Sequence, residues 1–526
     1  MPPRREGLWL VLGALLISLF LSALDSTIIA TALPTIVGDL GGLDHIAWVF
    51  TAYLLSSTVS VPLFGKISDI YGRRGVFQVT IVIFLVGSAL AGIAQTMTQL
   101  ILFRGIQGIG GGGLLAMTFT ILGDILSPRE RPKYMGYFTG VFAAASVIGP
   151  LIGGFFVDSL SWRWVFYVNI PIGLVALLVT AKYLDVPDPT ERRPIDFLGS
   201  GLFTVAVTTL LLGATWGGTE YAWTSLTIVG LFTGGLLFSA LFLFQERRAV
   251  EPLLPLRMFK NDIFSVSITM AVLFGSVMVA GSVFLPLFLQ IVRGVSATSS
   301  GFLLVPMMGG ILAGSTYGGR LISKTGRYKV FSLVGGALCI AGVAMLAMID
   351  INTTRTFVSI SMSILGLGIG TASPVMTLAV QNVAARGEMG AATSAVNFFR
   401  SLGSAFGVAI FGAIQSARLH AVLAARLSNG TAVGDDILNS PKAVLGMPAP
   451  VRQAIQEAVA SGVGQVFKWA LPVIILGFLV SFLLREVPLR DDVNLGSAAI
   501  EGLEEAGFGM LGEPGPPGLN EGLDNV

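Results

Sequence analysis

The sequence predicts an all-α protein that crosses a membrane many times. Hydrophobic residues make up 53% of the 526 residues and charged residues only 12%, whereas a soluble domain carries about 25% charge. Mean hydropathy is +0.81, and apolar runs recur that approach the length of about 20 residues needed to span a bilayer. The single cysteine, Cys339, lies inside such a run, which excludes a disulfide framework and a thiolate metal site.

Fourteen apolar runs are candidates for membrane-spanning helices. The first run is long and has no small-residue cleavage site, so we interpret it as a span and not as a removed signal peptide. In chain order, the expected spans are 8–34, 46–65, 76–95, 98–122, 134–157, 163–184, 196–217, 223–244, 263–291, 298–321, 330–349, 356–380, 391–415 and 466–484.

Basic residues orient these expected spans. Clusters of Lys and Arg fall on alternate connections, namely Arg4/Arg5, Lys66/Arg73/Arg74, Arg129/Arg131/Lys133, Arg192/Arg193, Arg247/Arg248/Arg257/Lys260, Arg320/Lys324/Arg327/Lys329, Arg386 and Arg485/Arg490. The positive-inside rule places these connections and both termini on the cytoplasmic side of a cell membrane. The exception is 416–465, an expected outer loop with four basic residues and a weak signal for an amphipathic helix near 450–463. Long translocated loops escape the rule, so this loop does not overturn the topology.

A charged turn occurs twice in the chain. "GKISDIYGRRG" follows the second expected span, and "GRLISKTGRYK" follows the tenth. An offset of eight spans predicts two six-helix halves separated by an inserted helix pair, and parallel six-helix repeats are a known transporter plan. Such a turn can latch one half to the other. The matching positions are Gly65 with Gly319, Gly72 with Gly326, and Arg73 with Arg327.

The repeat predicts four segments. The first half covers 1–184, a linker with two accessory spans covers 185–262, and the second half covers 263–485 with the outer loop 416–465. The remaining tail, 486–526, is rich in Gly, Pro and acidic residues, so we expect it to be disordered.

Asp25 is the only acidic residue found deep within an expected span. A carboxylate at the centre of a membrane helix costs about 2.5–3.5 kcal/mol, which favours the protonated form and suits a group that takes up and releases protons. Two arginines within spans, Arg104 and Arg400, are candidate partners, because arginine keeps its charge in proteins. The alternative hypothesis is a static ion pair that only sets helix packing.

The sequence shows few of the motifs that are typical of enzymes. No GxxxxGK[ST] phosphate-binding loop occurs, which argues against a nucleotide-driven pump. "GIGGGG" at 108–113 matches GxGxxG formally but lies inside an apolar span, where no nucleotide-binding βαβ unit can form. The two histidines, His45 and His420, fall in expected outer loops. We therefore expect no cofactor, metal or nucleic acid, and a membrane enzyme or receptor is the remaining alternative class.

Five stretches resemble motifs of the major facilitator superfamily, in its fourteen-helix drug:proton antiporter branch of multidrug efflux transporters. The resemblance covers 8–485 and leaves the tail outside. The stretches are "GKISDIYGRRGVF" (65–77), "LDSTIIATALPTI" (24–36), "LILFRGIQGIGGGG" (100–113), "GVFAAASVIGPLIGG" (140–154) and "NFFRSLGSAFGVA" (397–409).

The resemblance implies a secondary transporter that works by alternating access, as a monomer, and exchanges protons for a small lipophilic substrate. It implies proton coupling through Asp25 and Arg104, with Arg400 as a further candidate. The alternative on the same scaffold is export of an endogenous lipid or secondary metabolite. The implied cytoplasmic gate comprises Gly65, Asp69, Gly72, Arg73, Arg74 and Asp124, and the implied antiporter kink comprises Gly149, Pro150, Gly153 and Gly154.

Overall fold

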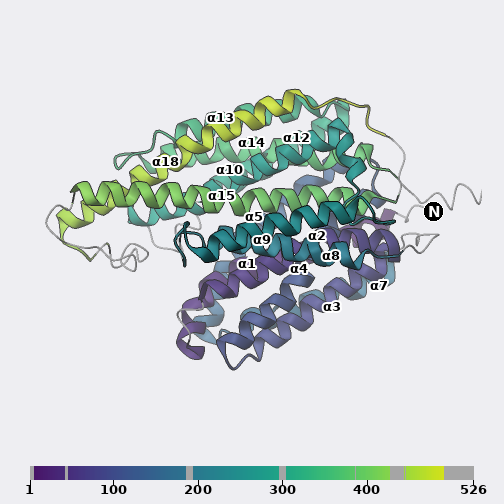
Figure 1. Cartoon of the computed structure of the whole chain (residues 1–526), viewed down its shortest axis with the longest axis horizontal. Helices are drawn as coiled ribbons and strands as arrows, with labels where there is room; N and C mark the ends of the chain where they lie inside the picture. Colours follow the sequence, from purple (N-terminus) through teal and green to yellow (C-terminus); the bar gives the residue numbers. More distant parts are fainter. Residues whose placement is uncertain are drawn as a thin grey trace, which may run out of the picture.

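The computed structural model of the chain consists of long helices (Figure 1). It describes residues 5–41, 46–184, 194–218, 220–294, 304–385, 387–426, 444 and 446–490. Within these ranges no β-strand forms, as expected for a chain that must satisfy its backbone hydrogen bonds inside a bilayer.

The N-terminal helices form one bundle, drawn in purple and blue in Figure 1. α4 packs against both α2 and α3, while α1 packs against α5 and α7. The helices are α1 (Arg5–Leu40), α2 (Ile46–Tyr71), α3 (Arg73–Gly92), α4 (Met97–Ile125), α5 (Arg131–Ser159), α6 (Trp164–Tyr167) and α7 (Asn169–Tyr183).

The C-terminal helices form a second bundle, which ends in the yellow α18. α14 packs against α12 and α13, and α15 packs against α10 and α18. The helices are α10 (Asp262–Ile291), α12 (Val305–Thr325), α13 (Lys329–Leu346), α14 (Arg355–Val383), α15 (Met389–Arg426) and α18 (Ala449–Phe482).

Two accessory helices lie between these bundles in sequence. They are α8 (Phe197–Trp216) and α9 (Leu226–Glu246), and a short 3-10 helix, η2 (Leu256–Lys260), precedes α10. α8 packs against α9 and also contacts both α2 and α15. The accessory pair therefore touches both bundles.

Thirteen of the described helices are long and apolar enough to cross a membrane, one fewer than the sequence predicts. The difference is α12, which overlaps the expected span 298–321 but carries several hydroxyl side chains, Arg320 and Lys324, and so has lower hydropathy. It nevertheless packs along α14 and α5. The expected tail, 486–526, lies outside the described residues from position 491 onward.

The expected outer loop 416–465 is largely helical, which corrects that prediction. α15 continues to Arg426 and α18 begins at Ala449, so only the part between them can connect the two helices. Two of the polar residues that led to the loop prediction form contacts between the two helices. Arg418 donates to Ser461 at 2.9 Å, and Arg426 forms an ion pair with Glu457 at 2.9 Å.

The two bundles meet through small residues at one end of the molecule. This is the end at which α2 turns into α3, and we call it the turn end. A Cβ atom on Gly65 would overlap Ser394 of α15, and one on Gly319 would overlap the Pro132 carbonyl of α5. Larger side chains at these two glycines would therefore push the halves apart.

Candidate functional site

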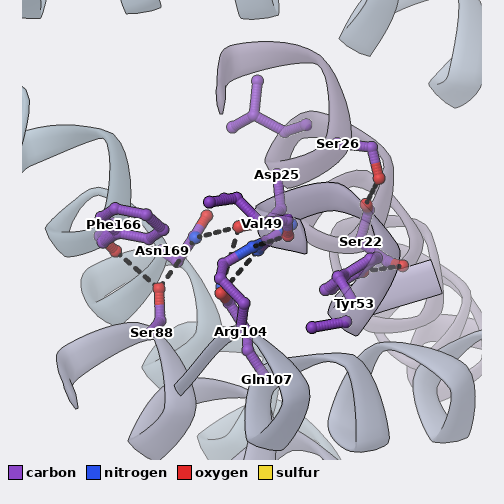
Figure 2. A network of polar contacts seen from close by, with 12 residues as sticks. Ser22, Asp25, Ser26, Val49, Tyr53, Ser88, Arg104, Gln107, Phe166 and Asn169 are labelled. Atoms are coloured by element: carbon purple, nitrogen blue, oxygen red, sulfur yellow. Dashed lines mark hydrogen bonds and ion pairs between the residues drawn. The ribbon is translucent and has the colours of Figure 1, made fainter. Parts of the chain in front are cut away.

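Asp25 and Arg104 form an ion pair in the middle of the N-terminal bundle (Figure 2). Arg104 Nη1 lies 2.5 Å from Asp25 Oδ2, and both residues have no exposed surface. Asp25 comes from α1 and Arg104 from α4, so the pair joins two helices that are far apart in sequence. Of the two candidate arginines, the structure places Arg104 beside Asp25.

Amide side chains complete the coordination of the pair. Gln107 Oε1 accepts from Arg104 Nη1 at 2.7 Å, and Gln107 Nε2 donates to Asp25 Oδ1 at 2.8 Å. Asn169 Nδ2 lies 3.4 Å from the same Asp25 oxygen and 3.0 Å from Ser88 Oγ. The carboxylate of α1 is therefore held by side chains of both α4 and α7.

Tyr53 of α2 covers the guanidinium group. The Arg104 Cζ atom lies 4.3 Å from the centre of the Tyr53 ring, a cation–π arrangement. The Tyr53 hydroxyl lies 3.2 Å from Ser22 Oγ, one turn before Asp25 on α1. Arg104 Nε also donates to the Val49 carbonyl at 3.4 Å. Groups of α2 thus contact the Asp25–Arg104 network in addition to the groups of α4 and α7.

In this arrangement, the packing of α1 against α4 and α7 depends on the charge of Asp25. A buried ion pair is tolerable only when its geometry and hydrogen bonds are good, and removing one charge strands the other. If Asp25 takes a proton, Arg104 keeps its positive charge and loses its counter-ion. The contact between α1 and α4, and the partner to which Asn169 of α7 donates, therefore both depend on this carboxylate.

Arg400 lies apart from this network. Its side chain is half-buried, and Nη2 donates to Asn397 Oδ1 at 2.7 Å, within α15 itself. No ion pair to Arg400 forms among the residues that the structure describes. The structure therefore does not bring the second candidate arginine to Asp25.

Arg73 organises the expected gate at the turn end. Its guanidinium lies 2.5 Å from Asp69 Oδ1 and 2.6 Å from Asp124 Oδ2, and it donates to Ser68 Oγ at 2.6 Å. Asp124 is the acidic residue near the end of α4. One arginine thus holds α2, α3 and α4 of the N-terminal bundle together.

Asp69 also reaches the other bundle. Its two carboxylate oxygens accept from the backbone N–H groups of Gly390 and Ala391, at 3.0 and 2.9 Å. These are among the first residues of α15, where unpaired N–H groups and the helix dipole favour a negative charge. We call this contact, with Gly65 packed against Ser394 beside it, the seam.

The other two gate candidates act within the N-terminal bundle. Gly72 has φ +92°, a left-handed conformation that lets α2 turn directly into α3. Arg74 donates to the carbonyl of Ala181 in α7. In this conformation, therefore, Arg74 contributes nothing across the seam.

The expected antiporter motif lies where α5 packs against α1. Its four residues are Gly149, Pro150, Gly153 and Gly154. A Cβ atom on Gly149 would overlap Thr27, and one on Gly153 would press on the α1 backbone, so these glycines allow close approach. Gly154 has no neighbour within 4 Å and does not contribute to that contact. α5 is thus packed against the same turn of α1 that carries the carboxylate.

Comparison with known proteins identifies the architecture. A family model described as Major Facilitator Superfamily matches residues 15–408. The chain belongs to the major facilitator superfamily. As a member of this superfamily it is a multi-pass membrane transport protein and not an enzyme.

Named relatives of this superfamily member include two bacterial proteins. Multidrug transporter protein MdtP of Bacillus subtilis (strain 168) is 43% identical over 412 residues, which are 78% of this chain and 75% of that protein. Multidrug resistance protein 3 of the same organism is 37% identical over 486 residues, 90% of this chain and 94% of that protein. The human organic anion transporter MFSD10 (TETRAN) has a TM-score of 0.60 at 14% identity, covering 90% of this chain and 99% of its own, which shows a shared fold.

Sequence reasoning missed two members of the transporter's buried network, Gln107 and Asn169. Both are amides inside expected spans, and Gln107 follows Arg104 by three residues, which places the two on one helix face. It also missed Arg131, which is fully buried, donates to the Leu126 carbonyl at 2.8 Å and lies 3.3 Å from Gln381 Oε1 of α14. An unexplained polar residue inside an apolar run is the signal for the two amides, whereas Arg131 lies in a connection between expected spans and counted there only as a basic residue that orients the chain.

Proposed function

We propose that this transporter exports lipophilic, drug-like compounds, lipophilic monocations included, in exchange for protons. In this proposal both termini are cytoplasmic, the turn end faces the cytoplasm, and protons enter from outside. The observation that carries the proposal is the fully buried Asp25–Arg104 pair with its amide partners. The two relatives named as multidrug proteins support the substrate class.

Asp25 is the proton site in this mechanism. Uptake of a proton neutralises the carboxylate and leaves Arg104 without its counter-ion, so α1 and α4 gain freedom to shift. One proton moving down 100 mV supplies about 2.3 kcal/mol, which is enough to accumulate substrate against a moderate gradient. Arg400, which lies outside the network, has no part in this step.

The seam controls access from the cytoplasm. With Asp69 bonded to the start of α15 and Gly65 packed beside it, the inner ends of the halves are closed. Export requires this contact to open so that substrate can enter from the cytoplasm, and to close before release outside. The acid-free second turn, with Ser323 at the place of Asp69, makes the latch asymmetric.

Proton-driven transport in liposomes tests the proposal. Purified protein is reconstituted with a fluorescent lipophilic cation, and dye movement is measured with and without an imposed pH difference. We expect Asp25→Asn to reduce pH-driven transport by about tenfold or more, since an intramembrane acid is functional by default. Asp39→Asn is the matched control, because Asp39 is another α1 carboxylate but its side chain is 57% exposed and accepts a hydrogen bond from Trp162 Nε1 at 2.8 Å.

Two results would reject the proposal. Wild-type dye movement that ignores the pH difference would remove proton coupling. Full pH-driven transport by an equally well inserted Asp25→Asn variant would remove Asp25 from the coupling. Transport of membrane lipids or metabolites in place of the dye would favour the alternative substrate class on the same scaffold.

A further inference from the structure

The segment between α9 and α10, residues 247–261, runs along the seam, and we call it the strap. It follows the accessory helix pair and includes η2. Three strap residues are buried in the hydrophobic core that is formed mainly by residues of the C-terminal bundle, namely Leu253, Leu254 and Met258. Glu246, at the end of α9, accepts from the backbone N–H groups of Leu253 and Leu254 at 3.1 and 3.2 Å, which holds the strap in a defined loop.

The first anchor of the strap is on the N-terminal bundle. Glu251 Oε2 lies 2.8 Å from Lys66 Nζ of α2, and the two side chains are only 14% and 8% exposed. Lys66 directly follows Gly65 and precedes Asp69 by three residues, so this ion pair adjoins the seam. A salt bridge this sheltered is less screened by salt than one on an open surface.

The second anchor is on the C-terminal bundle. Arg257 forms an ion pair with Glu388, through both Nε and Nη2. Glu388 lies two residues before Gly390, which donates to Asp69 across the seam. The Phe259 ring packs edge-on against Phe399 of α15, with ring centres 6.1 Å apart.

We propose that the strap is a second fastener of the closed seam. Its two ion pairs hold residues on opposite sides of one contact, Lys66 in α2 and Glu388 at the start of α15. When α2 separates from α15, a strap of fixed shape can follow only one bundle, so at least one anchor must break. The accessory helices thereby bias the transporter toward the conformation closed at the turn end.

The packing of the accessory pair supports this role. α8 contacts both α2 and α15. The Phe203 ring of α8 lies 5.1 Å from the Phe398 ring of α15. The inference requires the seam to open during transport but is independent of the substrate and of proton coupling.

Distance measurements between spin labels test the strap directly. Labels at Tyr71→Cys, at the end of α2, and Lys324→Cys, in the last turn of α12, report the separation of the halves at the turn end, in a Cys339→Ser background. Both label sites are exposed, and Cys339 is buried. The full-length protein in liposomes is expected to give a short and a long distance, whose populations give the closed-to-open ratio.

Neutralising each anchor should raise the open population. We expect Glu251→Gln to increase the open-to-closed ratio about threefold to tenfold, because its ion pair is sheltered. Arg257 is 72% exposed on its side chain, so Arg257→Gln should give only about a twofold increase. Arg247→Gln and Lys260→Gln remove strap charges for which the described residues show no ion pair, and both should leave the ratio unchanged.

A charge exchange distinguishes the ion pair from general damage. Lys66→Glu combined with Glu251→Lys should restore a closed population that either single change reduces. Unchanged distances in both Glu251→Gln and Arg257→Gln would overturn the proposal. An exchange variant that folds but stays as open as the single variants would do the same. If the wild-type protein shows no proton-driven transport but Glu251→Gln still raises the open population, the result counts against the proposed function and leaves the strap proposal standing.

Discussion

Two of the aspartate–arginine pairs in the molecule, Asp25–Arg104 and Asp69–Arg73, use the same chemistry in different surroundings. Asp25 and Arg104 are 2.5 Å apart, and their further polar partners all come from the N-terminal bundle. Asp69 and Arg73 are also 2.5 Å apart, but Asp69 additionally binds the start of α15 in the other bundle. The contacts of the first pair stay within one half, whereas Asp69 of the second pair loses its bonds to α15 when the halves separate.

In the proposed function, this difference separates the two tasks that a proton exchanger requires. A proton site must change its contacts when it changes charge, and a latch must change its contacts when the halves move. The buried pair suits the first task because loss of one charge strands the other. The seam suits the second task because its hydrogen bonds to α15 break as soon as α2 moves away.

The largest effect is expected when Arg104 is replaced, because this change removes one charge of the buried pair. Arg104→Gln leaves the Asp25 carboxylate buried without a counter-charge, which we expect to cost about 3–5 kcal/mol of stability. Thermal unfolding of the purified protein in detergent measures the loss. The double variant Asp25→Asn with Arg104→Gln should recover much of this stability while staying inactive in proton-driven transport. A double variant that is no more stable than Arg104→Gln would show that the pair is not energetically coupled.

A smaller effect is expected at the seam. Asp69→Asn weakens the bonds to Gly390 and Ala391, and losing such a helix cap costs about 1 kcal/mol, a change of about fivefold in the closed-to-open ratio. Asp124→Asn is the matched change, since Asp124 also bonds Arg73 but, among the described residues, forms no hydrogen bond or ion pair with α15. Labels at Tyr71→Cys and Lys324→Cys should therefore show more opening for the first variant. Equal opening in both would mean that Arg73, and not the α15 contact, holds the seam.

The smallest effect concerns the second copy of the turn. Gly326 has φ +72° and Gly72 has φ +92°, so both turns hold a glycine at positive φ, but their ψ angles of −3° and 150° give different backbone conformations. Ser323 has a carbonyl that accepts from Arg129 Nε at 3.4 Å, across the two bundles. Ser323→Asp should strengthen closure by about 0.5 kcal/mol, a typical value for an exposed charge pair. Ser323→Asn, which lacks the charge, is the control, and an equal response of the two variants would exclude an electrostatic origin.

The sequence predicted the helical membrane architecture and the buried position of the Asp25 carboxylate, because both depend on positions along the membrane normal. Apolar length locates a helix, and Asp25 stands out by its depth. The side chains that face Asp25 are determined by the rotation of each helix about its axis. An apolar run without a polar face does not reveal that rotation. Arg104 and Arg400 were therefore both candidates, and Asn169 was missed. The outer loop was wrong for a related reason, since charges paired between α15 and α18 resemble loop charges.

The confinement of the Asp25 network to one half has an evolutionary consequence. Every side chain that binds its carboxylate lies between positions 104 and 169, before the first accessory helix begins. Under the proposed function, mutations in the second half would leave every observed partner of the proposed proton site in place. Such a separation would let one scaffold change its cargo while the site that couples it to protons is inherited intact.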